Sequence, residues 1–203
     1  MILQGVVIMK EKLGCVVMAA GSARRFGDNK LESQLRGRSL ILRALETVPA
    51  ELLDTVVVVT QYPEVMRLAQ EFHFAAVHNP HPEKGLSHTI ALGLTGLRDC
   101  AGVLFLVADQ PLLRRESVEQ LIRTWREQPE KIAALSHGGV RGNPCLFPAR
   151  FFPDLLELRG DQGGSAVIRC HEDQLLLLEV PEAELTDVDT QADLEALRRS
   201  PTA

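Results

Sequence analysis

The sequence lacks long apolar runs and any excess of basic residues. Apolar stretches such as Val56 to Val59 and Leu175 to Leu178 fall far below the roughly 18 residues that a membrane span needs. Lys and Arg number 22 against 27 Asp and Glu, and the net charge of -5 argues against a nucleic-acid partner. Met1 to Met9 is apolar, but no cationic region precedes it and no small-residue cleavage site follows it. We therefore expect a cytoplasmic protein with neither a membrane nor a nucleic acid as its partner.

A cysteine framework and the common phosphate-binding patterns are also absent. The four cysteines are widely separated and include no Cys-x-x-Cys pair, so we expect core or half-buried thiols rather than a zinc site. Around Gly21 and Gly27, which are six residues apart, neither a P-loop nor a Gly-x-Gly-x-x-Gly pattern occurs. A small-molecule partner fits this composition best, and any phosphate site is of another kind.

Short apolar runs rich in Val, Leu and Ile alternate with amphipathic segments, which predicts the α/β class. We expect one domain over residues 13–199, a mainly parallel twisted sheet with helices on both faces, after a dispensable N-terminal extension at residues 1–12. The predicted strands are Leu13 to Ala19, Thr55 to Thr60, Ala75 to His78, Gly102 to Val107, Ile132 to Leu135 and Gln174 to Val180. The predicted helices are Ser39 to Val48, Pro63 to Glu71, Ser87 to Leu97, Arg115 to Gln128, Ala149 to Leu158, Gly163 to Cys170 and Gln191 to Arg199.

Two segments carry more specific structural predictions. Val103 to Val107 is continuously apolar, which predicts a strand buried on both faces near the middle of the sheet. Between Ser136 and Phe147 the residues His-Gly-Gly-Val-Arg-Gly-Asn-Pro break both helix and regular strand. We therefore expect an irregular excursion or a hairpin there rather than another crossover unit.

The loop after the first predicted strand combines small residues with cations. In an α/β sheet the ligand crevice lies beyond the carboxyl ends of the strands, which is where this loop falls. Small residues from Ala19 to Ala23 allow a ligand to approach the backbone, and Arg24, Arg25 and Lys30 supply positive charge for a triphosphate. The alternative is that Gly21 and Gly27 are turn glycines and that the arginines form a solvated surface.

Asp109 follows the predicted central strand, and Pro111 soon prevents that strand from continuing. A carboxylate at this place points to Mg²⁺, which proteins hold with one or two carboxylates while phosphate oxygens and waters complete the octahedron. The alternative is that Asp109 only caps the following turn.

Five stretches in order carry a resemblance to the MobA-like nucleotidyltransferases, and within them to the molybdenum cofactor cytidylyltransferases. They extend over nearly all of the chain from Leu13 to Leu197. The stretches are Ala19 to Gly27 with Lys30, Asn79-Pro80 with Gly85 to Ser87, Ala108 to Pro111, Gly142 to Pro144 with Gly160 to Gly163, and Asp187 to Thr190 with Asp193-Leu194. Two departures from the cytidylyltransferases are His88-Thr89, in place of small hydroxylated residues, and Asn143, in place of a frequent His.

The resemblance implies a Rossmann-like nucleotidyltransferase fold, Mg²⁺ as cofactor and a role for each matching residue. The implied catalytic residues are Arg24, Lys30 and Asp109. The implied nucleotide-binding residues are Ala19, Ala20, Gly21, Ser22, Arg24, Arg25, Lys30, Asn79 and Ser87. The implied metal ligands are Asp109 and Asp189. The implied acceptor-binding residues are Asn143, Asp161, Gln162 and Gly163.

The implied reaction is transfer of CMP from CTP to the phosphate of molybdopterin, with release of pyrophosphate. Ala20-Gly21 stands where guanylyl-transferring relatives typically have Gly-Gly, and by analogy the extra methyl group favours a pyrimidine. The acceptor phosphate is ionised near neutral pH, since its second pKa is about 6, so no general base is required. A molybdoenzyme or its chaperone is a further expected partner. Guanylyl transfer to the same cofactor, nucleotidyl transfer to a sugar phosphate or other phosphorylated metabolite, and a non-catalytic nucleotide-binding module remain as alternatives.

Overall fold

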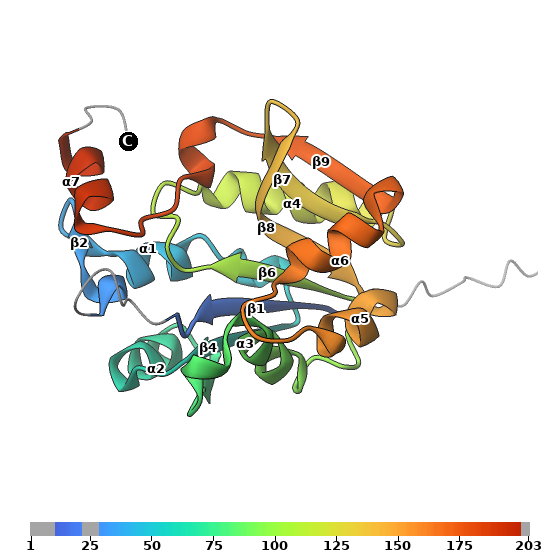
Figure 1. Ribbon diagram of the computed structural model, residues 1–203, viewed down its shortest axis with the longest axis horizontal. Helices are drawn as coiled ribbons and strands as arrows, with labels where there is room; N and C mark the ends of the chain where they lie inside the picture. Colours follow the sequence, from blue (N-terminus) through green and yellow to red (C-terminus); the bar gives the residue numbers. More distant parts are fainter. Residues whose placement is uncertain (1–10, 22–28, 200–203) are drawn as a thin grey trace, which may run out of the picture.

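The computed structural model describes residues 11–21 and 29–199 (Figure 1). Within these residues seven strands form one sheet in the order β5-β4-β1-β6-β8-β7-β9. Their bounds are β1 Leu13–Ala19, β4 Thr55–Thr60, β5 Ala75–His78, β6 Gly102–Val107, β7 Ile132–His137, β8 Val140–Pro148 and β9 Leu175–Glu179. Four of the six strand pairings are parallel, and β8 runs antiparallel to both of its neighbours. The predicted α/β class and the mainly parallel sheet are confirmed.

Helices cover both faces of the sheet. Their bounds are α1 Leu40–Glu46, α2 Pro63–Glu71, α3 Leu86–Leu94, α4 Arg115–Glu127, α5 Phe152–Glu157, α6 Gly164–Cys170 and α7 Gln191–Arg199. Successive side chains of a strand point to opposite faces, and in β1 Val17 packs with α1, α2 and α4 while Val16 packs with α3, α5 and α6. Each face therefore has its own apolar cluster, which is the two-sided arrangement that the sequence predicts.

The predicted central strand is confirmed. β6 lies fourth of seven in the sheet, and Val103 to Leu106 are buried to within a few per cent. β1 pairs with both β4 and β6 in parallel, with Ala19 opposite Thr60 and Met18 opposite Val107. These registers bring the carboxyl ends of three strands to one edge of the sheet, where the residues that follow β1, β4 and β6 meet.

The segment from Ser136 to Phe147 is a hairpin. β7 and β8 are joined through Gly138 and Gly139, whose φ values of 56° and 77° lie in the left-handed region that glycine tolerates. A second small hairpin, β2 Gln34–Leu35 with β3 Arg38–Ser39, was not expected from the sequence. Its strands are too short for an alternating pattern to reveal them.

The domain is already structured at the end of the predicted extension. The Lys12 carbonyl oxygen accepts from the Ala101 N–H at 2.8 Å, and the Lys12 ammonium lies 2.7 Å from the Asp99 carboxylate. Residues 1–10 of the predicted extension lie outside the described residues. In the described part, no helix is long and apolar enough to cross a bilayer.

Candidate nucleotide and metal site

A pocket of about 360 Å³ opens at the carboxyl ends of β1 and β6. Its walls come from four parts of the chain, namely the loop after β1, the start of α3, the loop after β6 and the loop before α6. The lining residues are Met18, Ala19, Ala20, Gly21, Lys30, Leu31, Pro82, Gly85, Leu86, Thr89, Val107, Ala108, Asp109 and Asp161. The position agrees with the general rule that ligands of open α/β sheets bind beyond the carboxyl ends of the strands.

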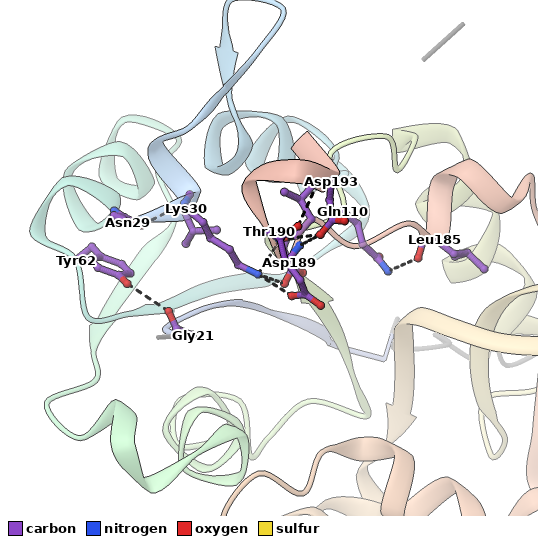
Figure 2. Close-up of polar contacts among 12 residues, drawn as sticks. Gly21, Asn29, Lys30, Tyr62, Gln110, Leu185, Asp189, Thr190 and Asp193 are labelled. Atoms are coloured by element: carbon purple, nitrogen blue, oxygen red, sulfur yellow. Dashed lines mark hydrogen bonds and ion pairs between the residues drawn. The ribbon is translucent and has the colours of Figure 1, made fainter. Parts of the chain in front are cut away.

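Lys30 connects the two carboxylates predicted as metal ligands (Figure 2). It begins the short 3-10 turn Lys30–Glu32, which the Asn29 side chain caps by accepting from the Leu31 N–H at 3.2 Å. The Lys30 ammonium donates to Asp109 Oδ2 at 2.8 Å and to Asp189 Oδ1 at 3.3 Å. Three residues from three separate predicted stretches thus meet around one cation.

The contacts of Val188 explain why Asp109 and Asp189 lie close together. The Val188 N–H donates to the Asp109 carbonyl oxygen at 2.9 Å, and its own carbonyl oxygen accepts from the Lys30 ammonium at 3.0 Å. The Val188 side chain is fully buried in a small apolar cluster with Leu40 and Leu194. This anchor carries the next residue, Asp189, to the carboxyl end of β6.

A cap at the start of α7 fixes the backbone beside Asp189. Asp193 Oδ2 accepts from the N–H groups of Asp189 at 3.0 Å and Thr190 at 2.7 Å. In return the Thr190 hydroxyl accepts from the Asp193 N–H at 3.2 Å, which makes a reciprocal capping box (Figure 2). These hydrogen bonds hold the pKa of the Asp193 carboxyl below its ordinary value, with the Thr190 contacts contributing first.

The charges at this site influence one another strongly. Desolvation alone would lower the pKa of the Lys30 ammonium, but the charge and hydrogen bond of Asp109, with those of Asp189, outweigh it and raise that pKa. The pKa of the Asp187 carboxyl is raised, first by desolvation and then by the negative charge of Asp109. Asp187 belongs to a stretch that the sequence singled out, but no role was assigned to it.

The two carboxylates of Asp109 and Asp189 suit a hard divalent cation whose coordination shell is completed by a bound ligand and waters. In residues 11–21 and 29–199 no group of three or more His, Cys, Asp or Glu side chains is arranged to hold a metal ion. Asp109 and Asp189 nevertheless already share one cation, the Lys30 ammonium. Two carboxylates with phosphate oxygens and waters are what Mg²⁺ typically takes, whereas zinc sites need nitrogen or sulfur ligands. The residues present therefore fit Mg²⁺ or Mn²⁺.

A second, more apolar pocket of about 80 Å³ adjoins the first. It shares Met18, Leu86 and Val107 with the first pocket, and its lining includes Asn143 and Gly163, two of the predicted acceptor residues. Two neighbouring pockets that share a wall suit two substrates that react with each other.

The predicted acceptor loop packs directly on the start of α3. The Ser87 N–H donates to the Gly160 carbonyl oxygen at 3.0 Å. A methyl group built on Gly85, whose φ is +84°, would lie only 2.4 Å from the Gly160 backbone and 2.6 Å from Asp161 Oδ1. Glycine at position 85 is therefore what lets the two loops touch, and Asp161 reaches the first pocket rather than the second.

Not every predicted site residue lines one of these two pockets. Asn79 is fully buried, with its side chain bonded to the Thr89 hydroxyl at 3.3 Å and the His81 N–H at 2.9 Å. Ser87 is also buried, and it lines neither of the two pockets. The Gln162 side chain is exposed and accepts from the Arg159 N–H at 3.0 Å. Ser22, Arg24 and Arg25 lie outside the described residues.

Sequence reasoning missed several residues that shape the site. Leu86 and Thr89 line the first pocket, although the resemblance drew attention to Ser87 between them. Gln61 and Tyr62 follow β4 and bond to the loop after β1. A signal for these two was available, since they follow a predicted parallel strand and so fall at the expected ligand crevice.

The fold and site define a nucleotide-binding α/β protein with a cation and two carboxylates at the carboxyl ends of its parallel strands. Residues 15–175 match the family described as MobA-like NTP transferase domain. The chain is 30% identical to the purine catabolism protein PucB of Bacillus subtilis, an alignment that covers 91% of this chain and 95% of that protein. The chain belongs to the MobA-like family and is a nucleotidyltransferase.

Two further similarities are more distant. A probable molybdenum cofactor guanylyltransferase of Natranaerobius thermophilus is 25% identical over 59% of this chain and 58% of that protein. The crystal structure of Rv0371c from Mycobacterium tuberculosis superposes with a TM-score of 0.79 at 20% identity, covering 94% of this chain and 98% of that one. At this identity the structural similarity supports the fold alone.

Proposed function

We propose that this chain transfers CMP from CTP to the phosphate of molybdopterin, in a reaction that depends on Mg²⁺. Family membership supports nucleotidyl transfer. The observation that carries the proposal furthest is the cluster of Lys30, Asp109 and Asp189. Lys30 and Asp109 of this cluster line a pocket whose other wall is the loop Ala19 to Gly21. A triphosphate with its metal ion is bound by positive charge, by carboxylates that hold the metal and by a backbone that the phosphates can approach closely.

In this proposal Arg24, Arg25 and Lys30 bind the phosphates and Asp109 and Asp189 hold Mg²⁺. When bound, the metal ion neutralises charge on the phosphates and positions them. An oxygen of the ionised acceptor phosphate forms a bond to the α-phosphorus, and the bond from that phosphorus to the β-phosphate oxygen breaks. Pyrophosphate leaves with the electron pair. Lys30 serves by charge and position, because its raised pKa keeps it protonated at neutral pH.

The acceptor is proposed to bind over the second pocket, which at about 80 Å³ encloses only part of it, with its phosphate toward the first pocket. Asn143 and Gly163 line the second pocket, and Asp161 stands at the first, where the two substrates would meet. The buried side chains of Phe105, Phe147 and Leu155 form the apolar part of this lining, and the Asn143 amide adds a polar group for the acceptor. Asn79, Ser87 and Gln162 support the walls through the hydrogen bonds described above.

CTP is proposed over GTP because of Ala20. Ala20 follows β1 directly, is only 3% exposed and adds a methyl group next to Gly21 in the lining of the first pocket. Guanylyl transfer is the second candidate, and the guanylyltransferase name of the Natranaerobius relative favours it. We further propose a cytoplasmic location, with a molybdoenzyme or its chaperone as the recipient of the product.

The test is a turnover screen that crosses CTP and GTP with molybdopterin and simple sugar phosphates while pyrophosphate release is measured. The proposal expects the highest kcat/KM for CTP with molybdopterin, and no turnover after the divalent metal is chelated. A clear preference for GTP would move the protein to guanylyl transfer. Turnover of sugar phosphates without molybdopterin turnover would refute the acceptor.

A further inference from the structure

The loop from Ala19 to Gly21 is tied to the end of β4 by a series of side chains. Three consecutive residues donate to three consecutive carbonyl oxygens, each 41 positions away in the sequence. The pairs are Thr60 Oγ1 to Ala19 at 2.9 Å, Gln61 Nε2 to Ala20 at 2.9 Å and Tyr62 Oη to Gly21 at 3.3 Å. The last of these is drawn in Figure 2. The side chains thereby continue the contact between β1 and β4 beyond the point where the strands end.

These bonds decide how the peptide groups of the loop are oriented. In a trans peptide the carbonyl and the following N–H point in opposite directions. Because the Ala20 carbonyl points at Gln61, the Gly21 N–H points away from Gln61. Gly21 itself lines the first pocket, and a methyl group added there would meet no atom of the described residues within 4 Å. In this part of the chain the Gly21 N–H donates to no backbone group, so it can serve as a donor to a ligand.

Small residues make the loop easy to reorient unless it is held. Glycine loses more conformational freedom on ordering than any other residue, so an unsupported loop would have to be ordered when a ligand binds. A rotation of the Ala20-Gly21 peptide would also present a carbonyl oxygen, instead of an N–H, to an anionic or acceptor-rich ligand. Thr60 is fully buried and belongs to the sheet, whereas Gln61 and Tyr62 are half-buried and hold the outer part of the loop.

We propose that Gln61, assisted by Tyr62, is a positioning residue that sets nucleotide affinity by fixing the backbone donors of the loop from Ala19 to Gly21. This inference rests on the proposed function, because it requires that a nucleotide binds at this loop. Gln61 acts through the Ala20 peptide and not on the acceptor. Loss of the Gln61 side chain therefore weakens nucleotide binding and leaves the acceptor KM unchanged.

The test compares Gln61→Met and Gln61→Glu with the parent chain by calorimetry, using CTP and GTP with Mg²⁺. Both variants keep the side-chain length and lose the donor, and only the second adds a negative charge. Loss of a hydrogen bond to the loop weakens binding of the preferred nucleotide at least about fivefold in both variants. Tyr62→Phe, which removes only the hydroxyl, gives a smaller loss in the same direction.

Gln70→Met is the matched control, because Gln70 is exposed near the end of α2 and its side chain makes no hydrogen bond to Ala19, Ala20 or Gly21 in the described structure. The inference expects this variant to bind like the parent, and all variants to melt within about 2 °C of it. A nucleotide affinity within twofold of the parent for both Gln61 variants overturns the inference alone. The inference is also overturned if a Gln61 variant melts at a lower temperature, binds the nucleotide more weakly and has a higher acceptor KM, all in proportion. Such a result would mean that Gln61 has a purely structural role. A parent chain that binds neither nucleotide overturns the proposed function and this inference together.

Discussion

At the residue scale the chemistry depends on one ammonium shared by two carboxylates. The Lys30 side chain is 13% exposed, against 25% for Asp109 and 58% for Asp189, so the Lys30 to Asp109 pair lies in the less solvated part of the site. Charge interactions are stronger where water is scarce. We therefore expect substitutions at Lys30 and Asp109 to have larger effects than substitutions at exposed ion pairs.

Asp109→Asn keeps the side-chain shape and removes the negative charge. We expect turnover to fall by at least about two orders of magnitude, because the proposed metal and Lys30 both lose their main partner. The melting temperature should change by no more than a few degrees, about 1 kcal/mol at this chain length. Asp99→Asn is the control, since Asp99 makes the same kind of pair with Lys12 on the exposed surface. Near-normal activity of Asp109→Asn with an unchanged metal requirement would refute the metal-ligand assignment.

The raised pKa of Lys30 gives a prediction for pH. A group whose pKa is higher in the folded chain stabilises it fully below the unfolded value, here about 10.5, and loses this contribution as pH rises through the folded value. We expect the difference in unfolding free energy between the parent and Lys30→Met, about 1 kcal/mol, to stay constant from pH 7 to 10 and shrink above pH 10.5. Urea denaturation at several pH values measures it. A difference that shrinks already near pH 8 would contradict the shift.

At the scale of elements, two loops from different parts of the chain form one wall. The loop before α6 touches the start of α3 through Gly85, whose missing side chain leaves room for the Gly160 backbone. Glycine is also needed at position 163, since a methyl group there would lie 2.6 Å from Leu86 Cδ2. Leu86 lines both pockets, so the proposed nucleotide and acceptor regions share this wall.

We expect Asp161→Ala to raise the acceptor KM about fivefold or more, while CTP affinity measured by calorimetry stays within about threefold of the parent. The reason is that Asp161 lines the first pocket but belongs to the loop assigned to the acceptor, and Gly163 of the same loop lines the second pocket. Asp173→Ala provides the control, because Asp173 is exposed and its carboxylate accepts from the side chain of the neighbouring Gln174, outside both pockets. Collapse of CTP affinity with normal acceptor binding would show that the assignment of the two regions is reversed.

At the scale of the whole molecule, Lys12 and Leu13 already make hydrogen bonds to the rest of the domain. The Lys12 carbonyl oxygen and the Leu13 N–H are both bonded within the domain, the latter to the Asp54 carboxylate at 2.8 Å. Lys12, which the sequence analysis assigns to the extension, therefore bonds to the domain, and the boundary after residue 12 stays a prediction.

Deleting Met1 to Ile8 should leave activity and melting temperature nearly unchanged, because the contacts of Lys12 and Leu13 remain. Thermal unfolding and pyrophosphate release of the two chain lengths provide the measurement. A drop of more than about 5 °C, roughly 1 to 3 kcal/mol at this size, would mean that the segment packs on the domain.

The sequence by itself determined the class, the central strand and the chemical character of the site. The period of the hydrophobic pattern shows which faces of a strand are buried. The continuous apolar run from Val103 to Val107 therefore indicated a buried strand without any tertiary information. Motif order likewise identified Lys30, Asp109 and Asp189 as functional candidates.

Only the tertiary structure decided which of these candidates meet. Asp109 and Asp189 share Lys30 because Val188 is buried and bonded to the Asp109 backbone, a contact between positions 79 apart that no local pattern encodes. Asn79 is turned inward by two contacts of different range. Its side chain accepts locally from the His81 N–H two residues on, and it donates to the Thr89 hydroxyl in α3. Gln61 and Tyr62 carry no motif at all, and their contact with the loop after β1 exists only because two distant strands pair in parallel register.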